Sequence, residues 1–259
     1  MDFFVKKSDL LKELNFVRSA VEKRNTIPIL SHLLLEAEGF ELKISATDSE
    51  IGARTACLAK VRTKGTAVIP ALRFLDIVRS APDGEIRCRA LENNWVQVTY
   101  QRSSFKVVGL GKDDFPKLPD VPKPITKLDV QLLVDCVQKT SFAMSAEESR
   151  FVLNGALFKL HPDGVKMVAT DGHRLALAER KQQLPELKQD VSILVPRKAL
   201  LSVRKLADEH EEGAKIELSQ DDSTYSSRLG HAFSLRGSSL VSSRITNRCC
   251  QRKMGTSPS

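Results

Sequence analysis

The segment Asp171-Gly172-His173-Arg174 contains the residue types best suited to chemistry in this sequence. An Asp beside a His can orient an imidazole for acid–base catalysis, or the two can share a metal ion. The sequence has no Ser nucleophile motif, no His-x-x-x-His and no Gly-rich phosphate loop to support such a role. Because Asp48 ends an equivalent strand-like run earlier in the chain, we expect Asp171 to cap a turn. The alternative to this capping role is that Asp171 and His173 act in catalysis, which would make the chain a small α+β enzyme.

The cysteines give no metal-ligand pattern. Cys57, Cys88 and Cys136 are isolated among apolar residues, and Cys249 and Cys250 are adjacent. Structural zinc sites need closely spaced pairs of Cys or His ligands. We therefore expect reduced thiols, no metal and no cofactor.

The basic residues are unevenly distributed along the chain. The net charge is +8, but the 28 residues after His231 contain five Lys and Arg and no acid. Residues 1–231 contain 35 basic and 32 acidic residues, a net charge of only +3. A basic protein is a candidate for binding nucleic acid. Here the net charge alone is weak evidence, because most of it lies in the last residues.

The sequence shows neither a secretory signal nor a membrane span. Residues 1–7 place an acid and two lysines around a very short apolar patch. No apolar run approaches the roughly 20 residues that a membrane-spanning helix needs. We expect a cytoplasmic protein that does not contact membranes.

A repeat with an offset of 123 residues organises the chain. Ala46-Thr47-Asp48 in the first half returns as Ala169-Thr170-Asp171, and each copy follows a pair of strand-like runs. These runs are residues 32–38 and 41–45 in the first half and 156–160 and 165–168 in the second. Two unrelated α+β domains would not predict a constant offset. We therefore expect one α+β unit to occur twice.

Helices flank each predicted strand pair. Apolar residues at helical spacing precede each pair, at Leu10, Leu11, Leu14, Val17 and Val21 and at Leu132, Leu133, Cys136, Val137 and Thr140. A second helix should open at Pro70 and at Pro196, with the proline in the first turn. Its buried residues would be Leu75 and Val78, or Leu200 and Val203.

Alternating strands should follow the second helix, at residues 85–90, 95–100 and 103–108 in the first half. The segment 113–124, with four prolines, should link the halves. The predicted domains are residues 1–121 and 122–231, followed by a tail at 232–259.

Six short motifs, in order and at family spacing, resemble the bacterial DNA polymerase sliding clamp, the beta subunit of the replicative polymerase. The motifs are Arg24-Asn25-Thr26-Ile27-Pro28-Ile29-Leu30, Val68-Ile69-Pro70-Ala71, Asp114-Phe115-Pro116, Leu153-Asn154-Gly155, Ala169-Thr170-Asp171-Gly172-His173-Arg174-Leu175 and Val195-Pro196-Arg197-Lys198. The resemblance covers residues 1 to about 231.

The resemblance implies a noncatalytic ring around duplex DNA that tethers replication enzymes. Its fold would be a repeated α+β clamp domain, two helices packed on antiparallel sheets, with helices lining the hole. Family members have three such domains and close as a head-to-tail homodimer. This chain would hold the first two, the second incomplete at its C-terminal end.

The implied partners are double-stranded DNA, the DNA polymerase III catalytic subunit, the clamp loader and other proteins with clamp-binding motifs. A further alternative to a working clamp is that this chain is a truncated product with no function.

The first implied site is a basic inner surface, because a sliding ring must attract phosphates without gripping bases. The candidates lie on or beside the four helices, and each could instead be an ordinary solvated charge. They are Arg24, Arg73, Arg79, Lys139, Arg197, Lys198 and Arg204.

The second implied site is a pocket for short apolar partner peptides. The matching positions are Leu153, Thr170, Gly172, His173, Arg174 and Leu175. Leu153 and Leu175 would form apolar walls, and Gly172 would let the peptide backbone approach. In the family, the rest of this pocket comes from the end of the second domain and from the third.

The third implied site is a dimer interface at the edge of the first domain. Phe105 and Val107 match family positions there, with Ile77 nearby. A half-buried strand with no interface role is the alternative. Because the reciprocal surface belongs to the third domain, we expect that this chain alone does not close a ring.

Residues 232–259 do not continue the repeat, and Ser, Arg, Gly and Thr dominate them. Reading residues 239–247 one base earlier, with permissible codons, yields Leu-Thr-Gly-Gln-Phe-Pro-Asn-Tyr-Glu, which contains the Phe-Pro motif expected to close a second domain. We hypothesise a frameshift after His231 and a disordered, out-of-frame tail. An ordinary disordered basic tail is the alternative.

Overall fold

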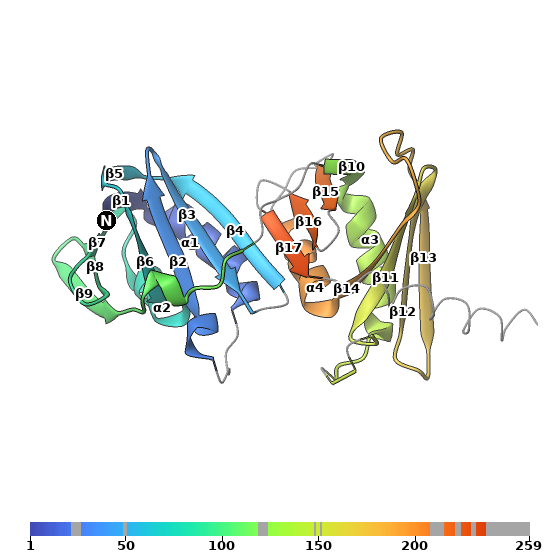
Figure 1. Ribbon diagram of the computed structural model, residues 1–259, viewed down its shortest axis with the longest axis horizontal. Coiled ribbons are helices and arrows are strands. Elements are labelled where there is room, and N and C mark those ends of the chain that lie inside the picture. The colour runs from blue at the N-terminus through green and yellow to red at the C-terminus, as the bar shows by residue number, and fades with distance from the viewer. Residues whose placement is uncertain are drawn as a thin grey trace, which may run out of the picture. The chain divides into compact units, whose positions relative to one another are not determined.

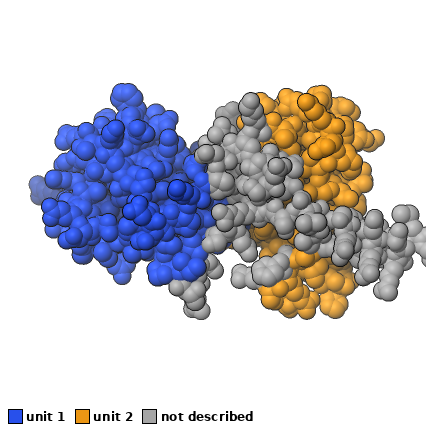
Figure 2. Space-filling model, in the orientation of Figure 1, with its two compact units in different colours: residues 1–121, 230–235 blue, residues 122–229, 236–259 orange. Residues whose placement is uncertain are grey.

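The computed structural model describes residues 1–21, 27–48, 51–118, 124–147, 149–150, 152–207, 215–220, 224–228 and 232–236. The chain forms two compact units, shown in Figure 2. Unit 1 comprises residues 1–121 and 230–235, and unit 2 comprises residues 122–229 and 236–259. Across these described ranges, none of the helices combines the length and the apolar character needed to span a bilayer.

Unit 1 contains two antiparallel sheets (Figure 1). The first has the strand order β5 (Lys60–Thr63), β1 (Asp2–Lys6), β7 (Glu85–Ala90), β8 (Trp95–Tyr100) and β9 (Ser103–Val108). The second has the order β17 (Ala232–Arg236), β4 (Ile51–Leu58), β3 (Glu41–Thr47), β2 (His32–Glu38) and β6 (Gly65–Pro70). Alternation of buried and exposed residues along β7 and β8 gives the first sheet one face for the core.

The helices of unit 1 are α1 (Lys7–Val17) and α2 (Ala71–Ser80), and they pack on each other. From α1, Leu10, Leu14 and Val17 are buried where the helix contacts β3 and β4. The last member of the predicted stripe, Val21, lies outside the helix, because α1 ends at Val17. A 3-10 helix (Arg18–Ala20) follows, and the buried Val21 lies beyond both helices.

The second helix starts one residue later than predicted. Pro70 is the last residue of β6 and the N-cap of α2, so it does not lie in the first helical turn. Pro196 likewise ends β14 (Val191–Pro196), and α4 (Arg197–Ala207) begins after it. The missing proline N–H is harmless at this boundary because no helical carbonyl is available to it. Phe74, Leu75 and Val78 then hold α2 in the core.

The start of the predicted linker belongs to unit 1. A 3-10 helix (Lys112–Asp114) precedes Phe115, whose side chain is buried against Ile29, Leu30 and Val68. Another 3-10 helix (Pro28–Ser31) supplies Ile29 and Leu30 to this cluster. The motif Asp114-Phe115-Pro116 therefore anchors the end of the unit to its core.

Unit 2 follows the same general order as unit 1, in which a strand, a helix, a group of strands, a second helix and further strands succeed one another. Its four-stranded sheet has the order β13 (Leu175–Lys181), β12 (Gly164–Thr170), β11 (Gly155–His161) and β14. A second set of antiparallel strands comprises β10 (Pro124–Asp129), β15 (Lys215–Gln220) and β16 (Thr224–Arg228). Helix α3 (Val130–Thr140) packs on α4 and contacts β12 and β13 (Figure 1). The Asp129 carboxylate caps α3 by accepting from the backbone N–H of Gln131 at 2.8 Å.

The predicted α+β class and the repeated plan of two helices on antiparallel sheets are confirmed. In the segment expected to be a disordered tail, the structure places strand β17 at the first five residues. This strand pairs with β4, with Ala232 opposite Arg54 and Leu235 opposite Ile51. The rest of the expected tail, residues 237–259, lies outside the described residues.

Candidate functional site

The topology of the unit 2 sheet brings the predicted peptide-pocket residues to one end of the sheet. Gly155 pairs with Pro196, Ala156 with Ala169, and Thr170 with Leu175. The segment before β11, the turn between β12 and β13, and the start of α4 therefore meet at this end. Leu153 lies in the first of these segments, and residues 170–175 form the second. We call this group of segments the unit 2 loop end.

The Asp171 carboxylate organises the turn at the unit 2 loop end. Its Oδ1 accepts from the backbone N–H groups of His173 and Arg174, both at 3.0 Å, and its Oδ2 accepts from Arg174 Nε at 2.9 Å. These bonds hold the pKa of Asp171 down at about 2, with the backbone donors the largest cause. Gly172 has φ +96°, a conformation that favours glycine.

The same geometry argues against an Asp–His catalytic pair. Asp171 contacts the backbone N–H of His173, and its oxygens are occupied by that group and by Arg174. The His173 side chain is exposed. Across the described residues, no group of three or more His, Cys, Asp or Glu side chains is placed to hold a metal ion.

Apolar side chains at the unit 2 loop end are open to solvent. Leu175 is 45% exposed, and Leu177 and Phe142 are more exposed still. The Arg174 guanidinium lies 5.7 Å from the centroid of the Phe142 ring, within cation–π range. Leu153 is half-buried. Sequence reasoning missed Phe142, because it lies in the 3-10 helix (Ser141–Ala143) after α3, where no spacing pattern marks it.

The exposed face of the two unit 1 helices is predominantly basic. Arg73 and Arg79 are exposed on α2, and Arg79 Nη2 donates to Asn15 Oδ1 of α1 at 2.9 Å. Lys12 and Arg18, which sequence reasoning missed, are exposed on α1 and on the 3-10 helix after it. We call Lys12, Arg18, Arg73 and Arg79 the basic helix face. Only Asp9 and Asp76 are exposed acids within these helices.

The basic candidates of unit 2 are less available. Lys139 forms an ion pair with Asp135 at 2.9 Å, and Arg180 contacts the same carboxylate. Arg197 Nη1 donates to the Met144 carbonyl at 3.2 Å, and Lys198 is half-buried. Arg204 lies in α4, but its side chain is outside the described residues, as is all of Arg24.

The predicted interface residues divide into exposed and buried ones. Phe105 is 38% exposed on β9, an edge strand, and its ring stacks on Tyr100 at 5.6 Å. Ile77 is half-buried on α2, which packs near β9. Val107 is only 5% exposed and packs in the core of unit 1. Phe105 is therefore the best placed of the three to contact another molecule.

Two family models match the chain. Residues 1–119 match the N-terminal domain of the DNA polymerase III beta subunit, and residues 127–236 match its central domain. The second match includes β17 and so extends five residues past the expected start of the tail. The predicted resemblance is confirmed.

Curated relatives and solved structures agree with these matches. The chain is 34% identical to the beta sliding clamp of Vibrio cholerae over 227 residues, 84% of this chain and 60% of the relative. It is 34% identical to that of Chlamydia muridarum over 211 residues, 81% of this chain and 57% of the relative. A crystal structure of the DNA polymerase sliding clamp from Caulobacter crescentus superimposes with a TM-score of 0.86 and 31% identity, covering 95% of this chain and 68% of that one.

The chain thus spans between about half and three fifths of the length of its curated relatives. The matched regions, the repeated fold and the motifs lead to one assignment: the chain belongs to the DNA polymerase III beta subunit family and contains its N-terminal and central domains.

Proposed function

We propose that this chain is part of a sliding clamp, a ring that encircles duplex DNA and tethers the replicative polymerase to it. The clamp acts by binding and catalyses no reaction. Its partners are double-stranded DNA, the DNA polymerase III catalytic subunit, the clamp loader, other proteins with clamp-binding motifs and a second copy of the subunit. Its place of action is the cytoplasm. Membership of the beta subunit family is the observation that carries the proposal.

The basic helix face supports a sequence-independent contact to DNA. Four exposed cations on two adjacent helices attract phosphates through long-range electrostatics. Long Lys and Arg side chains on a rigid helix surface can exchange one phosphate for the next without reading base edges. Such a surface holds the duplex while allowing it to slide.

Salt-dependent DNA binding tests this contact. Each neutralised phosphate contributes about 0.9 to the slope of log affinity against log salt for duplex DNA. We expect the double variant R73Q/R79Q to reduce that slope by about 2. K43Q/K64Q, which removes two exposed lysines outside the helices, is the control with the same net charge. Equal slopes for the two variants would contradict the proposal.

The unit 2 loop end is the proposed site for partner peptides. Leu153 and Leu175 offer apolar contacts, and Thr170, Gly172, His173 and Arg174 form the polar turn between them. Thr170 Oγ1 donates to the Arg174 carbonyl at 2.7 Å, so this turn keeps its shape without a ligand. Phe142 adds an exposed aromatic surface beside Arg174. A preformed apolar site loses little entropy when a peptide binds.

Peptide binding is tested with a fluorescently labelled clamp-binding peptide and fluorescence anisotropy. We expect F142A and L175A each to weaken binding by about tenfold, since each removes an exposed apolar contact. L58A truncates a leucine that is 74% exposed on unit 1 and serves as the control. Unchanged affinity in both loop-end variants would place the peptide elsewhere.

A further inference from the structure

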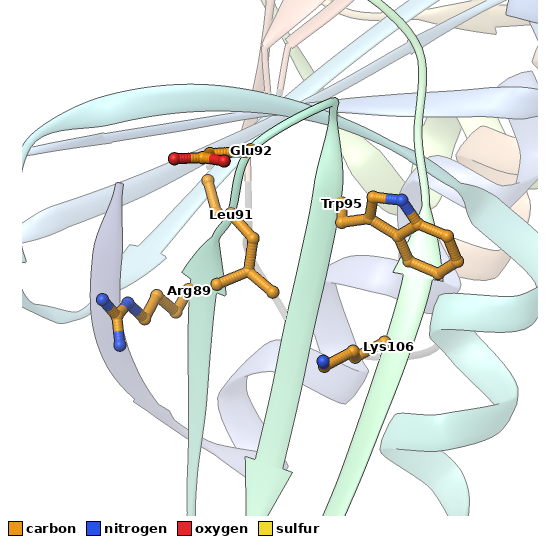
Figure 3. Close-up of a pocket in the computed structure, with 6 residues that line it drawn as sticks. Arg89, Leu91, Glu92, Trp95 and Lys106 are labelled. Carbon is orange, nitrogen blue, oxygen red and sulfur yellow. The ribbon is translucent and has the colours of Figure 1, made fainter.

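Strands β7, β8 and β9 of unit 1 form a pocket of about 720 Å³ that shares no lining residue with the basic helix face. It is lined by Arg89, Ala90, Leu91, Glu92, Trp95 and Lys106. Figure 3 shows Leu91 near the middle, with Arg89 on one side and Trp95 and Lys106 on the other. None of these residues has a part in the proposed duplex or peptide contacts.

The strand register places the charged and aromatic side chains on the outer face of the sheet. Val96, Val98 and Val107 are buried, whereas Arg89, Trp95 and Lys106 are exposed. Gln97 pairs with both Arg89 and Lys106, so the two cations lie on either side of the same residue of β8. Trp95 pairs with Val108, and its carbonyl accepts from Leu91 N–H at 2.7 Å. A cationic row thus lies beside an apolar row.

The hairpin between β7 and β8 fixes the apolar row. Asn93 and Asn94 have φ of 54° and 61°, the pattern of a tight hairpin turn. Trp95 N–H donates to the Glu92 carbonyl at 3.2 Å, and Gly109 N–H donates to the Asn94 carbonyl at 2.9 Å. The indole is therefore presented by a rigid hairpin, with 41% of Trp95 exposed.

The two cations of the pocket are available to a ligand. Neither Arg89 nor Lys106 forms an ion pair within the described part of the chain. Asp2 lies opposite Arg89 in the sheet, but Arg87 occupies both of its oxygens, at 2.9 and 2.7 Å. Glu92 is the one acid in the lining.

We propose that this pocket binds single-stranded DNA, with a base against Trp95 and the backbone phosphates near Arg89 and Lys106. An exposed indole flanked by cations is a stacking platform for an unpaired base. A duplex keeps its bases stacked inside and cannot present one to Trp95. Glu92 can accept a hydrogen bond from the exocyclic amino group of cytosine. The inference goes beyond the proposed function, since it adds a second nucleic-acid contact on another face.

Trp95 is the only tryptophan among the 259 residues, so its fluorescence reports on this pocket alone. The experiment titrates the full chain with a 12-nucleotide oligo(dC). We expect saturable quenching of the Trp95 fluorescence. The affinity for oligo(dC) should be about tenfold lower in R89Q/K106Q, because two phosphate contacts are lost. K43Q/K64Q, matched in net charge, should bind like the parent chain. E92A should bind oligo(dC) and oligo(dT) with more similar affinities than the parent chain does, because it removes the oxygens that accept from the cytosine amino group.

Two outcomes would overturn the inference: no quenching by oligo(dC), or equal quenching in R89Q/K106Q and the parent chain. Quenching by polyglutamate but not by oligo(dC) would also overturn it, because an acidic peptide would then be the ligand. The proposed duplex contact is tested independently of this pocket, because it depends on Arg73 and Arg79. Circular dichroism of each variant ensures that a lost signal does not reflect unfolding.

Discussion

The guanidinium of Arg79 donates a 2.9 Å hydrogen bond to the side-chain oxygen of Asn15. This bond joins the exposed surfaces of α2 and α1 and holds Arg79 on the basic helix face. An uncharged partner fixes the arginine without cancelling its charge. The Lys139–Asp135 pair of unit 2 contrasts with this arrangement, because there the cation faces an acid.

Replacing Asn15 with Asp should weaken duplex binding several-fold at low salt. The new carboxylate would pair with Arg79 and place a negative charge on the basic helix face. Anisotropy of a labelled 30-base-pair duplex measures the change. K43Q shifts the net charge by the same single unit on another surface and should bind as the parent chain does. Equal effects of N15D and K43Q would mean that only net charge matters.

Asp171 should titrate at about pH 2, well below an ordinary aspartate, because backbone donors and Arg174 stabilise its charged form. Its contribution to stability is therefore present above the unfolded-state pKa of about 3.9 and is lost as the pH falls toward 2. Carboxyl NMR titration measures the midpoint directly.

Two substitutions of Asp171 test its role in the turn. D171N keeps an oxygen that can accept from the backbone of His173 and Arg174, whereas D171A removes it. D171A should therefore weaken peptide binding more than D171N. A midpoint near 4, or equal effects of the two variants, would show that these hydrogen bonds do not shape the loop.

Cys57 and Cys88 should resist alkylation in the folded protein. Burial is the main cause that raises the pKa of both thiols, to about 12 for Cys57, where Glu13 and Asp9 also contribute. Because the raised pKa favours the neutral thiol, the stabilising contribution is present below the unfolded value of about 8.5 and is lost as the pH rises toward 12. Iodoacetamide labelling at pH 8, read site by site with mass spectrometry, should reach the buried Cys88 only after urea unfolding, and the half-buried Cys57 more slowly in the native than in the unfolded protein. Labelling of native Cys88 at the unfolded rate would contradict this packing.

Phe74 should be a major contributor to the core of unit 1. Its side chain is fully buried on α2, so F74A should lower the free energy of unfolding by about 3–5 kcal/mol. F40A removes a ring that is 82% exposed and should change it by less than about 0.5 kcal/mol. Urea unfolding followed by circular dichroism compares the two. Similar losses would mean that α2 is not packed as described.

The spacing of hydrophobic residues predicts the helices and the main hairpins. Burying one face of a helix or strand requires apolar residues to recur with the period of that element. The same spacing does not indicate the strands β1, β4, β5, β10 and β13. In β4, Gly52, Ala53 and Ala56 give no alternation of large apolar and polar residues. Strand β13 reads Leu-Ala-Leu-Ala, and its two leucines face solvent while its alanines are buried. Spacing does not indicate which face of such a strand meets the core.

The candidate sites depend on tertiary contacts that spacing does not encode. Lys12 and Arg18 were missed because nothing in the first helix marks which side faces α2. The resemblance places Val107 at the dimer interface, but the register of β9 points its side chain into the core of unit 1. The Trp95 pocket takes residues from three strands, so it exists only once those strands pair.

We expect the helix side of each unit, and not its sheet side, to face duplex DNA. Photo-crosslinking from unit 1 tests this orientation, with p-benzoylphenylalanine replacing Arg73 on α2 or Lys43 on β3. Lys43 is exposed between the buried Leu42 and Ile44, on the face of its sheet away from α1. We expect crosslinks to duplex DNA from position 73 and none from position 43. Crosslinks from position 43 alone would show that the sheet side faces the duplex.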